Sequence, residues 1–409
     1  MKILYFGTVC NIEAYNNRLS HCKTKPSVAP IVFESALLDG LYQNGAELEI
    51  HSFPMYPTFP NARFLYYGGN VETLSCGYTC RLLKTVNLPF LKQFIRKSDA
   101  RKQIKRFCKE NAESGVILTY SIPPFLVKDV IRYARRYSVK TVAVVTDLLR
   151  EMYMNEKLSG LMARLKRRYL AGALRYQGEY DGYVYLTEAM RDVVAPDKPY
   201  TVMEGIASLT KDDASFPKAF PRAVMYAGML HEKYGILNLL DAFEEANLPN
   251  TELWLFGEGN AVDSIRARAA KNGAIRYFGT VAREEILGYE KKATLLVNSR
   301  DPSEEFTKYS FPSKTIEYML SETPLLTTRL EGIPKEYEPH VFFAEGNSPQ
   351  QLANALKMAL SCSDDELFGK GEKAKEFIVK EKNAKIQSAK VMTLISEVTK
   401  WNCGSKKNR

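Results

Sequence analysis

The chain has 409 residues, 45% of them hydrophobic and 25% charged, and its formal net charge is +10. A chain of this length exceeds what one hydrophobic core usually supports, so we expect two domains. The composition is ordinary for a soluble globular enzyme and excludes a low-complexity chain. The longest apolar runs have the length of a strand, far below the roughly 20 residues needed to cross a bilayer, which excludes a helical membrane protein.

Cysteine usage and the N-terminal residues indicate the compartment. The seven cysteines are scattered without metal-ligand spacing, and the four histidines form no cluster. This pattern is typical of reduced thiols in the cytoplasm and predicts no metal site. Residues 1–7 lack the basic region, apolar core and cleavage site of a signal peptide and are instead typical of a first strand. We therefore predict a cytoplasmic protein.

Positive charge is concentrated in the first half of the chain. Residues 1–205 contain 29 Lys and Arg against 19 Asp and Glu, whereas the remainder contains 28 of each. Two basic amphipathic segments, 90–109 and 157–175, stand out. They form either solvated helix faces or a peripheral attachment to the anionic inner face of a membrane, where each cation contributes roughly 1 kcal/mol. We expect no nucleic acid as a partner.

The first half alternates strand-like and helix-like segments. Buried strands are expected at 2–7, 47–53, 115–120, 140–146 and 182–186. Helices are expected at 31–43 and 125–137, whereas residues 8–30 are expected to be irregular. Residues 54–87, rich in Tyr, Pro and Gly, are interpreted as loops or short strands of an acceptor surface. The alternation predicts a parallel α/β sheet, whose ligands lie outside the carboxyl ends of the strands.

The second half repeats this alternation after a polar linker at 207–221. Strands are expected at 223–228, 253–257, 275–281, 293–297 and 341–343. Helices are expected at 236–246 and 349–360, with helical periodicity continuing through Lys400. The loop after the first strand of the chain lacks the glycine-rich turn of a nicotinamide site, which argues against a dehydrogenase.

One stretch of the second half carries a ligand-binding pattern. A buried strand, 293–297, is followed by a loop and then by a helix that begins near Pro312, with Ser313 as the candidate N-cap. The free backbone N–H groups and the dipole of a helix start favour an anion, and Lys314 adds a positive charge. Glu317 lies one turn further and is placed to accept hydrogen bonds from the two hydroxyls of a ribose. These features predict a site for a nucleoside diphosphate.

A resemblance to a known family appears at the same residues. Family 4 glycosyltransferases of the GT-B type carry a nucleotide-sugar signature with two glutamates separated by seven residues, and in one variant Ser and Lys follow a Pro. The stretch Phe311-Pro-Ser-Lys-Thr-Ile-Glu-Tyr-Met319 resembles that variant. Glu317 matches the second glutamate, whereas Tyr309 stands at the position of the first. The resemblance implies an α/β protein of GT-B fold, in which two doubly wound parallel-sheet (Rossmann-like) domains face a cleft.

The resemblance also implies how the chain is divided. Residues 1–205 are expected to form the N-terminal, acceptor-side domain. Residues 206–380 are expected to form the C-terminal domain that binds the nucleotide sugar. The terminal helix, 381–400, is expected to return to the N-terminal domain.

Donor-binding residues follow from the same resemblance. It assigns donor contacts to Gly228, Lys233, Val281, Tyr309, Ser313, Lys314 and Glu317. In the family, an Arg after the first glycine of the second domain and a Lys before the next glycine bind the diphosphate, but Met229 and Tyr234 stand there in this chain. We therefore expect Lys314 and backbone amides to neutralise the diphosphate, with Lys314 acting in catalysis as the diphosphate departs.

The acceptor side is expected where strands of the first half end. Gly7 and Thr8 follow the first strand, and Tyr120 and Ser121 follow a later one. Asp147 follows the next strand, at a position where the resembling family often carries an acidic or imidazole group, so it is the candidate general base for the acceptor. The alternative is that Asp147 caps the helix that follows it.

The implied function is a retaining, hexosyltransferase-type transfer of a sugar from a nucleotide-diphosphate sugar to a saccharide or lipid-linked saccharide, in cell-surface polysaccharide biosynthesis. The nucleotide sugar is the substrate, and no cofactor is expected. Because the chain has no Asp-x-Asp pair, helix N-termini and Lys314 are expected to stabilise the diphosphate without a metal ion. Two alternatives stay open: a nucleotide-sugar epimerase or hydrolase of the same fold, and a non-catalytic sugar-binding protein.

Overall fold

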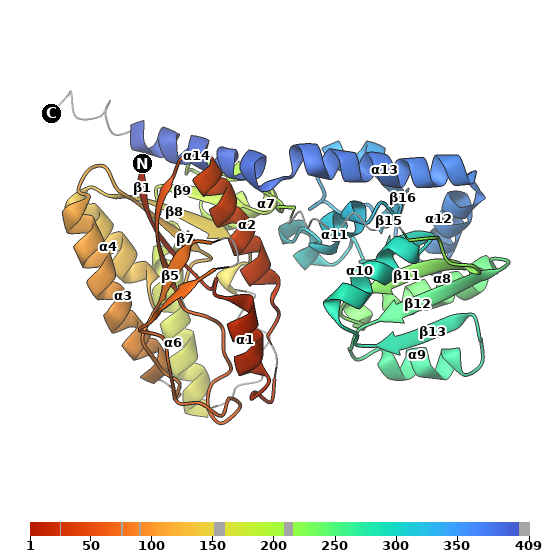
Figure 1. Ribbon diagram of the computed structural model, residues 1–409, viewed down its shortest axis with the longest axis horizontal. Coiled ribbons are helices and arrows are strands. Elements are labelled where there is room, and N and C mark those ends of the chain that lie inside the picture. Colours follow the sequence, from red (N-terminus) through yellow and green to blue (C-terminus); the bar gives the residue numbers. More distant parts are fainter. Residues whose placement is uncertain (25, 75–76, 90, 151–159, 208–215, 401–409) are drawn as a thin grey trace. The chain divides into compact units, whose positions relative to one another are not determined.

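The structure is a computed structural model that describes residues 1–409 except 25, 75–76, 90, 151–159, 208–215 and 401–409. It consists of two compact units, the first formed by residues 1–208 and 384–409 and the second by residues 209–383. Each unit contains a parallel sheet with helices packed on its faces (Figure 1). The predicted α/β class with two Rossmann-like halves is therefore confirmed.

The first unit is built on an eight-stranded sheet. The strands run in the order β10-β9-β8-β7-β1-β2-β5-β4, and only β4 is antiparallel to its neighbour. The strands are β1 (Lys2–Gly7), β2 (Glu47–Ser52), β4 (Val71–Thr73), β5 (Thr79–Leu82), β7 (Val116–Tyr120), β8 (Lys140–Val145), β9 (Gly182–Tyr185) and β10 (Tyr200–Val202), and a separate antiparallel pair is formed by β3 (Tyr66–Tyr67) and β6 (Thr85–Val86). The helices are α1 (Ile12–Leu19), α2 (Ala29–Gln43), α3 (Leu91–Glu110), α4 (Val127–Tyr137), α6 (Gly160–Gln177), α7 (Ala189–Val194) and α14 (Ala384–Lys400).

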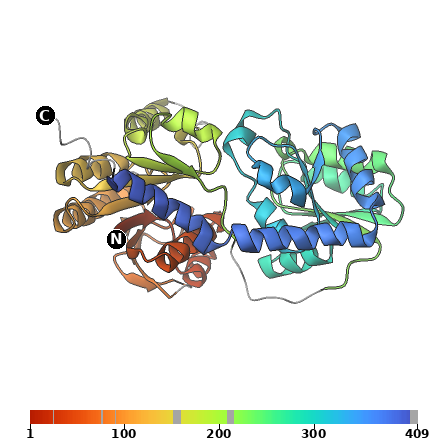
Figure 2. The ribbon, with the colours of Figure 1, turned by 90° about the horizontal axis from the view of Figure 1, so that it is seen from above.

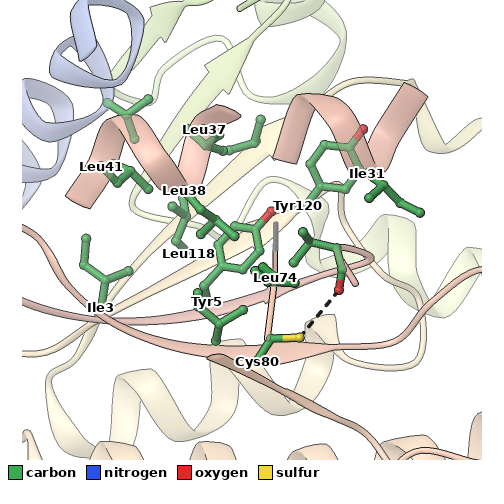
Figure 3. Packing of buried hydrophobic residues seen from close by; sticks show 14 of the residues in the cluster. Ile3, Tyr5, Ile31, Leu37, Leu38, Leu41, Leu74, Cys80, Leu118 and Tyr120 are labelled. Carbon is green, nitrogen blue, oxygen red and sulfur yellow. Dashed lines mark hydrogen bonds between the residues drawn. The ribbon is translucent and has the colours of Figure 1, made fainter. Parts of the chain in front are cut away.

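The core of the first unit explains its uninterrupted apolar strands. Side chains of β1, including Ile3 and Tyr5, pack against Leu37, Leu38 and Leu41 of α2 (Figure 3). Because helices cover both faces of a parallel sheet, residues on both sides of each strand are buried and alternation is lost. The five residues of β7 are all buried for this reason.

Helix α14 belongs to the first unit although it lies at the far end of the sequence (Figure 2). Leu394 and Val398 of α14 are buried in the first core. The Ser388 hydroxyl donates to the backbone oxygen of Leu37 at 3.1 Å. A Cβ atom at Gly40 would lie 2.0 Å from the backbone oxygen of Ala384, so α2 needs a glycine where α14 crosses it.

The expectation of an irregular segment at 8–30 is wrong. Residues Ile12–Leu19 form α1, and the side chain of Asn11 caps it by accepting a hydrogen bond from the Ala14 N–H at 3.0 Å. This helix is only eight residues long and mostly polar, with two buried residues, so it is easily taken for a loop.

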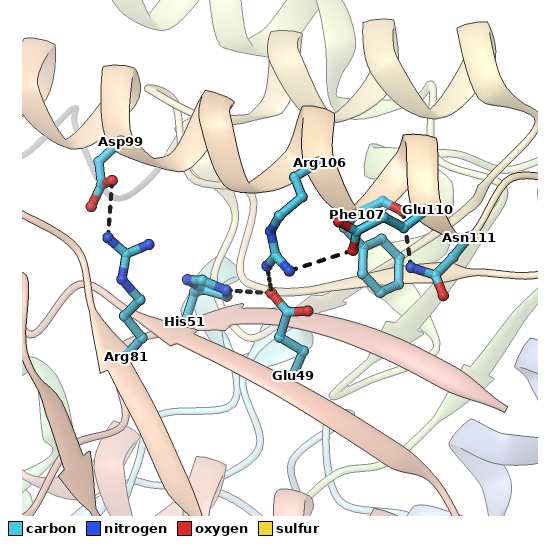
Figure 4. Close-up of polar contacts among 8 residues, drawn as sticks. All are labelled: Glu49, His51, Arg81, Asp99, Arg106, Phe107, Glu110 and Asn111. Atoms are coloured by element: carbon cyan, nitrogen blue, oxygen red, sulfur yellow. Dashed lines mark hydrogen bonds and ion pairs between the residues drawn. The ribbon is translucent and has the colours of Figure 1, made fainter.

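Some of the positively charged side chains of helix α3 are buried. Lys92 and Arg96 are only 8% and 2% exposed, so the expectation of a solvent- or membrane-facing side chain is wrong for both. Their spacing of four residues places them on one face of the helix, together with buried Asp99, which pairs with Arg81 of β5 at 3.4 Å (Figure 4). The basic residues of α3 that remain exposed are Arg101, Lys102, Lys105, Arg106 and Lys109. Residues 90 and 157–159 of the two basic segments lie outside the described residues, and across the described chain no helix is both long and apolar enough to cross a membrane.

The second unit is built on a six-stranded, fully parallel sheet. The strands run in the order β13-β12-β11-β14-β15-β16. They are β11 (Arg222–Ala227), β12 (Thr251–Phe256), β13 (Ile275–Gly279), β14 (Leu295–Asn298), β15 (Leu325–Thr328) and β16 (Phe342–Ala344). The helices are α8 (Ile236–Ala246), α9 (Val262–Ala269), α10 (Arg283–Lys292), α11 (Lys314–Leu320), α12 (Pro349–Ser361) and α13 (Asp364–Glu381), with 3₁₀ helices η1 (Glu232–Tyr234), η2 (Glu305–Tyr309) and η3 (Lys335–His340).

Candidate active site

The strand order of the second sheet reverses between β11 and β14. From β11 the chain moves outward through β12 and β13, and then returns to place β14 on the other side of β11. Gly228 follows β11, and Ser299 and Arg300 follow β14. Helical connections diverge at such a reversal and leave a crevice at the carboxyl ends of the two strands, where ligands of open α/β sheets bind.

Two glycines let backbone segments meet at this point. Gly235 has φ +77°, and a Cβ atom there would lie 1.9 Å from the backbone oxygen of Ser299. A Cβ atom at Gly257 would lie 1.8 Å from the backbone oxygen of Gly228. Gly235 is also the N-cap of α8, which carries no side-chain cap. The first N–H groups of α8 are therefore held beside the carboxyl end of β14, in an arrangement suited to a phosphate.

Arg300 is a site residue that the sequence analysis did not assign. Its guanidinium carbon lies 5.2 Å from the ring centre of Tyr234 and 6.0 Å from that of Phe306. Burial lowers the pKa of Arg300, and within the described residues no carboxylate forms an ion pair with it. Lys233 stands over the same two rings, at 5.1 and 5.8 Å. Arg300 and Lys233 therefore flank the same pair of aromatic rings. In the sequence, the signal for Arg300 was its position two residues after a strand.

Helix α11 is fixed beside the end of β11 by one tyrosine. The Tyr318 hydroxyl accepts a hydrogen bond from the Ala227 N–H at 2.8 Å and donates to the Ala227 oxygen at 3.0 Å. Ser313 occupies the N-cap position of α11, but its side chain makes no capping hydrogen bond, so the expected cap is wrong in that respect. Tyr309 ends η2, three residues after Phe306, and is half-buried. The fold thus gathers the candidate donor residues of α11 and η2 with Gly228 at one edge of the sheet.

Glu317 lies between two cations. Its carboxylate oxygens are 2.7 Å from Lys314 Nζ and 2.8 Å from Arg283 Nη2. Burial raises the pKa of Glu317, but the charges of Lys314 and Arg283 outweigh burial and hold the pKa below its ordinary value. Arg283 opens α10 two residues after Val281, so the segment expected near the nucleobase and the carboxylate expected at the ribose adjoin each other.

A second carboxyl group, Glu290 of α10, lies behind Glu317. Glu290 is fully buried, and within the described residues neither of its carboxyl oxygens has a hydrogen-bond donor. Burial and the negative charge of Glu317 raise the pKa of Glu290 to about 8. A protonated Glu290 can donate to Glu317, while Lys314 Nζ lies 3.9 Å from Glu290. Sequence reasoning missed Glu290 because a glutamate in a charged helix is usually solvated.

The reversal of strand order in the first sheet falls between β1 and β7. The predicted acceptor residues Gly7 and Thr8 lie at the end of β1, and Tyr120 and Ser121 lie at the end of β7, so the fold brings these two pairs to one edge. Ser121 has φ +61°, and its N–H donates to the backbone oxygen of Val144 at 2.7 Å.

The loop after β1 is already bound by a carboxylate of the same chain. Buried Glu34 of α2 accepts hydrogen bonds from Tyr5 Oη at 2.6 Å, from the Thr8 N–H at 2.8 Å and from the Val9 N–H at 3.3 Å. A Cβ atom at Gly7 would lie 1.8 Å from Glu34 Oε2, which explains the glycine. Burial raises the pKa of Glu34 to about 7 although these bonds oppose it. Thr8 thus helps to shape the loop through Glu34.

Asp147 follows β8 on the same edge. The residue is exposed, yet the protein around its carboxyl group displaces enough water to raise its pKa, against a hydrogen bond that Thr146 Oγ1 donates at 3.2 Å. Its negative charge also contributes to a raised pKa of Tyr120, so the two side chains are near each other. Of the helix that Asp147 was alternatively expected to cap, only residues 149–150 are described, because 151–159 lie outside the described residues.

A protein-family model matches part of the second unit. Residues 221–362 match the family model described as "Glycosyl transferases group 1". These residues contain β11, β14, Arg300 and Glu317, so the matched region carries the candidate donor site. No curated protein matches the chain in sequence.

Solved structures resemble the whole chain. Sucrose-phosphate synthase from Thermosynechococcus elongatus is 14% identical with a TM-score of 0.67, covering 97% of this chain and 99% of that one. HepE of Anabaena in complex with UDP is 13% identical with a TM-score of 0.61, covering 97% and 100%. The lipopolysaccharide outer core galactosyltransferase WaaB is 12% identical with a TM-score of 0.57, covering 97% and 99%. These likenesses establish the GT-B fold for this chain.

Replacing Glu290 with Gln should flatten the pH dependence of stability. The pKa of Glu290 is raised in the folded state from its ordinary 4.5 to about 8, so the native protein is favoured below pH 4.5 and loses stability as the pH rises toward 8. Glutamine still donates to Glu317 but does not titrate. Urea-unfolding midpoints measured from pH 5 to 9 should fall less steeply in Glu290→Gln than in the wild type, because one of the groups that lose protons in this range is removed. Exposed Glu285 of the same helix provides the control Glu285→Gln, and equal slopes in all three proteins would contradict the assignment.

Proposed function

We propose that this protein is a glycosyltransferase that moves a sugar from a nucleoside-diphosphate sugar to an acceptor. The observation that carries the proposal is the convergence of Gly228, Gly235, Arg300 and Glu317 at the reversal of the second sheet. This is the region that matches group 1 glycosyl transferases. The HepE structure that contains UDP supports a uridine nucleotide as the first donor to test.

In this proposal the diphosphate lies against the first N–H groups of α8. Arg300 and Lys233 neutralise its charge from the side of Tyr234 and Phe306. The ribose hydroxyls donate to Glu317, whose carboxylate is kept ionised and oriented by Lys314 and Arg283. Backbone atoms near Val281 contact the nucleobase.

Bond cleavage releases a nucleoside diphosphate with increasing negative charge on its leaving oxygen. Arg300, Lys233 and the N–H groups of α8 are already in place and stabilise that charge in the transition state. The positive charge of Lys314 adds to this stabilisation. We propose that donor cleavage and acceptor attack occur on one face of the sugar, which retains configuration without a protein nucleophile. The site then requires no metal ion. Tyr309 and Ser313 lie on the sugar side of the phosphates in this arrangement.

On the acceptor side, Asp147 receives the proton of the attacking hydroxyl. Its raised pKa brings the carboxylate closer to the pH at which a general base works well. Gly7, Tyr120 and Ser121 shape the surface on which the acceptor rests. A saccharide acceptor in polysaccharide biosynthesis is supported by the likeness to WaaB, which acts on lipopolysaccharide outer core by its name.

One assay separates this proposal from its alternatives. The purified protein is incubated with a panel of nucleotide sugars, with and without saccharide and lipid extracts, and released nucleoside diphosphate is measured. Release that depends on an acceptor supports a transferase, and acceptor-independent turnover supports an epimerase or hydrolase. Binding without turnover on any mixture would contradict the proposal and favour a sugar-binding protein.

Two substitutions should weaken binding of the nucleoside diphosphate for different reasons. Glu317→Ala removes the acceptor of two ribose hydroxyl bonds, and Arg300→Met removes a charge at the diphosphate; each should cost about 2–4 kcal/mol of binding free energy. Isothermal titration with UDP and with uridine distinguishes them, because Arg300→Met should spare uridine binding. Exposed Glu285→Ala and Lys271→Ala are the charge-matched controls. Wild-type affinity in a folded Glu317→Ala protein would remove Glu317 from the site.

Asp147→Asn should slow turnover and leave donor binding unchanged. Asparagine keeps the shape of the side chain but cannot accept the proton, so the rate should fall by roughly 10² or more. Exposed Asp192→Asn is the control in the same unit. Turnover near the wild-type rate would exclude Asp147 as the base.

We also propose that the protein works at an anionic, cytoplasmic membrane face. The exposed cations of α3, together with Arg164, Arg168 and Arg175 of α6, supply the charge. The triple variant Lys102→Gln, Lys105→Gln, Lys109→Gln should lose most of its co-sedimentation with anionic vesicles at low salt, since surface attraction is additive and screened by ions. The control replaces exposed Lys271, Lys357 and Lys373 of the second unit. Equal sedimentation with neutral and anionic vesicles would contradict this attachment.

A further inference from the structure

The first unit contains a pocket of about 470 Å³ that the proposed reaction does not use. It is lined in part by Arg18 of α1, by Tyr66 and Tyr67 of β3, and by Lys84, which follows β5. The Leu83 N–H donates to the backbone oxygen of Ser52 at 2.7 Å, so the segment carrying Lys84 continues from the carboxyl end of β5 beside that of β2. The pocket thus lies on the ligand-binding edge of the sheet.

Lys92 and Arg96 are buried cations one helical turn apart on α3, and Arg96 bonds to two residues that line the pocket. Arg96 donates to Thr85 Oγ1 at 3.1 Å, to the backbone oxygen of Pro54 at 2.8 Å and to the hydroxyl of Tyr67. Lys92 Nζ donates to the backbone oxygen of Tyr56 and to Thr58 Oγ1. All of these acceptors are neutral, so the hydrogen bonds orient the two cations without cancelling their charges.

Arg18 brings a third positive charge to the same place. Its guanidinium carbon lies 5.9 Å from the ring centre of Tyr56, and that of Arg96 lies 5.5 Å from the ring centre of Tyr67. The two rings are 4.9 Å apart. Arg18 Nη1 is buried and has no hydrogen-bond partner among the described residues. A residue that lines the pocket therefore carries an unpaired donor group.

The nearby acidic side chains are engaged elsewhere. Asp99 accepts from the Lys84 N–H at 3.0 Å and pairs with Arg81. Glu72 accepts from the Asn11 N–H and from Asn70 Nδ2. Among the described residues, none of the three cations Arg18, Lys92 and Arg96 forms an ion pair with a carboxylate.

Burying the positive charges of Arg18, Lys92 and Arg96 together costs free energy unless an anion binds beside them. Removing a cation from water requires a compensating charge, and cations that lie close together also repel each other. Burial, together with the charge of Arg96, lowers the pKa of Lys92 to about 7. A bound anion would relieve both effects, and a tetrahedral dianion can accept from donors on several sides at once.

We propose that this pocket binds a phosphate group of the acceptor, held by Arg18 and Lys84 and attracted by the buried charges of Lys92 and Arg96. Tyr66, which is 74% exposed at the rim, offers a ring face to the sugar or lipid that carries the phosphate. The pocket lies at the same sheet edge as Gly7, where the acceptor is proposed to rest. Assignment of the phosphate to the acceptor therefore rests on the proposed function. Phosphate binding itself does not depend on that function.

Isothermal titration of the full chain with glucose 6-phosphate tests the pocket. The variant Arg18→Gln, Lys84→Gln should bind it roughly tenfold more weakly or worse, because two charge-assisted donors are lost. The control Lys128→Gln, Arg136→Gln removes two exposed charges from α4 and should bind as the wild type does. The variant Arg300→Met should also bind normally, which separates this site from the donor site. If the double variant misfolds, Lys84→Gln alone decides, since Lys84 is exposed and its loss should still weaken binding severalfold.

A second arm identifies the source of the phosphate. Vesicles of phosphatidylcholine with phosphatidic acid are compared with vesicles of phosphatidylcholine and phosphatidylserine at equal surface charge. Selective loss of phosphatidic acid binding in the Arg18→Gln, Lys84→Gln variant supports a lipid phosphate, and loss of glucose 6-phosphate binding alone supports a soluble sugar phosphate. Equal affinity of this variant and the wild type for both probes, or no binding of either probe by the wild type, would overturn the proposal, whatever the outcome of the donor titrations.

Discussion

The parallel pairing of β11 with β14 is the constraint on which the candidate donor site depends. Because these strands run side by side while their connections diverge, Gly228 and Arg300 reach the same edge from positions far apart in sequence. Gly235 then allows α8 to start against the end of β14 without a clash. Charge, hydrogen-bond donors and space for an anion therefore arise from one arrangement of backbone.

The chain treats buried charge in two opposite ways. At the β1 loop, Glu34 occupies the backbone N–H groups of Thr8 and Val9, so the chain provides its own anion there. At the end of β14, by contrast, Arg300 has neutral aromatic neighbours. The pocket beside Tyr67 resembles the second case, with buried cations bonded to neutral oxygens. In our account the cationic sites bind phosphate, whereas the loop after β1 is held in place by Glu34.

The sequence predicted the regular parts of this protein well, since long apolar strands and amphipathic helices repeat with clear periods. It failed where burial reverses the usual preference of a residue. Glu290, Lys92 and Arg96 are typical surface residues by composition, and only tertiary contacts reveal that they are buried. Helix α1 was missed because it is short and mostly polar. Lys314 and Glu317 could be proposed from a local pattern, whereas Arg300 depends on strand pairing across the sheet.

A structure of the protein crystallised with UDP tests the central claim most directly. The account predicts that the diphosphate lies at the N-terminus of α8 within hydrogen-bond distance of Arg300, and that both ribose hydroxyls donate to Glu317. The nucleobase should then lie beside Val281. UDP bound elsewhere in the second unit, with Arg300 and Glu317 making no contact to it, would contradict the account.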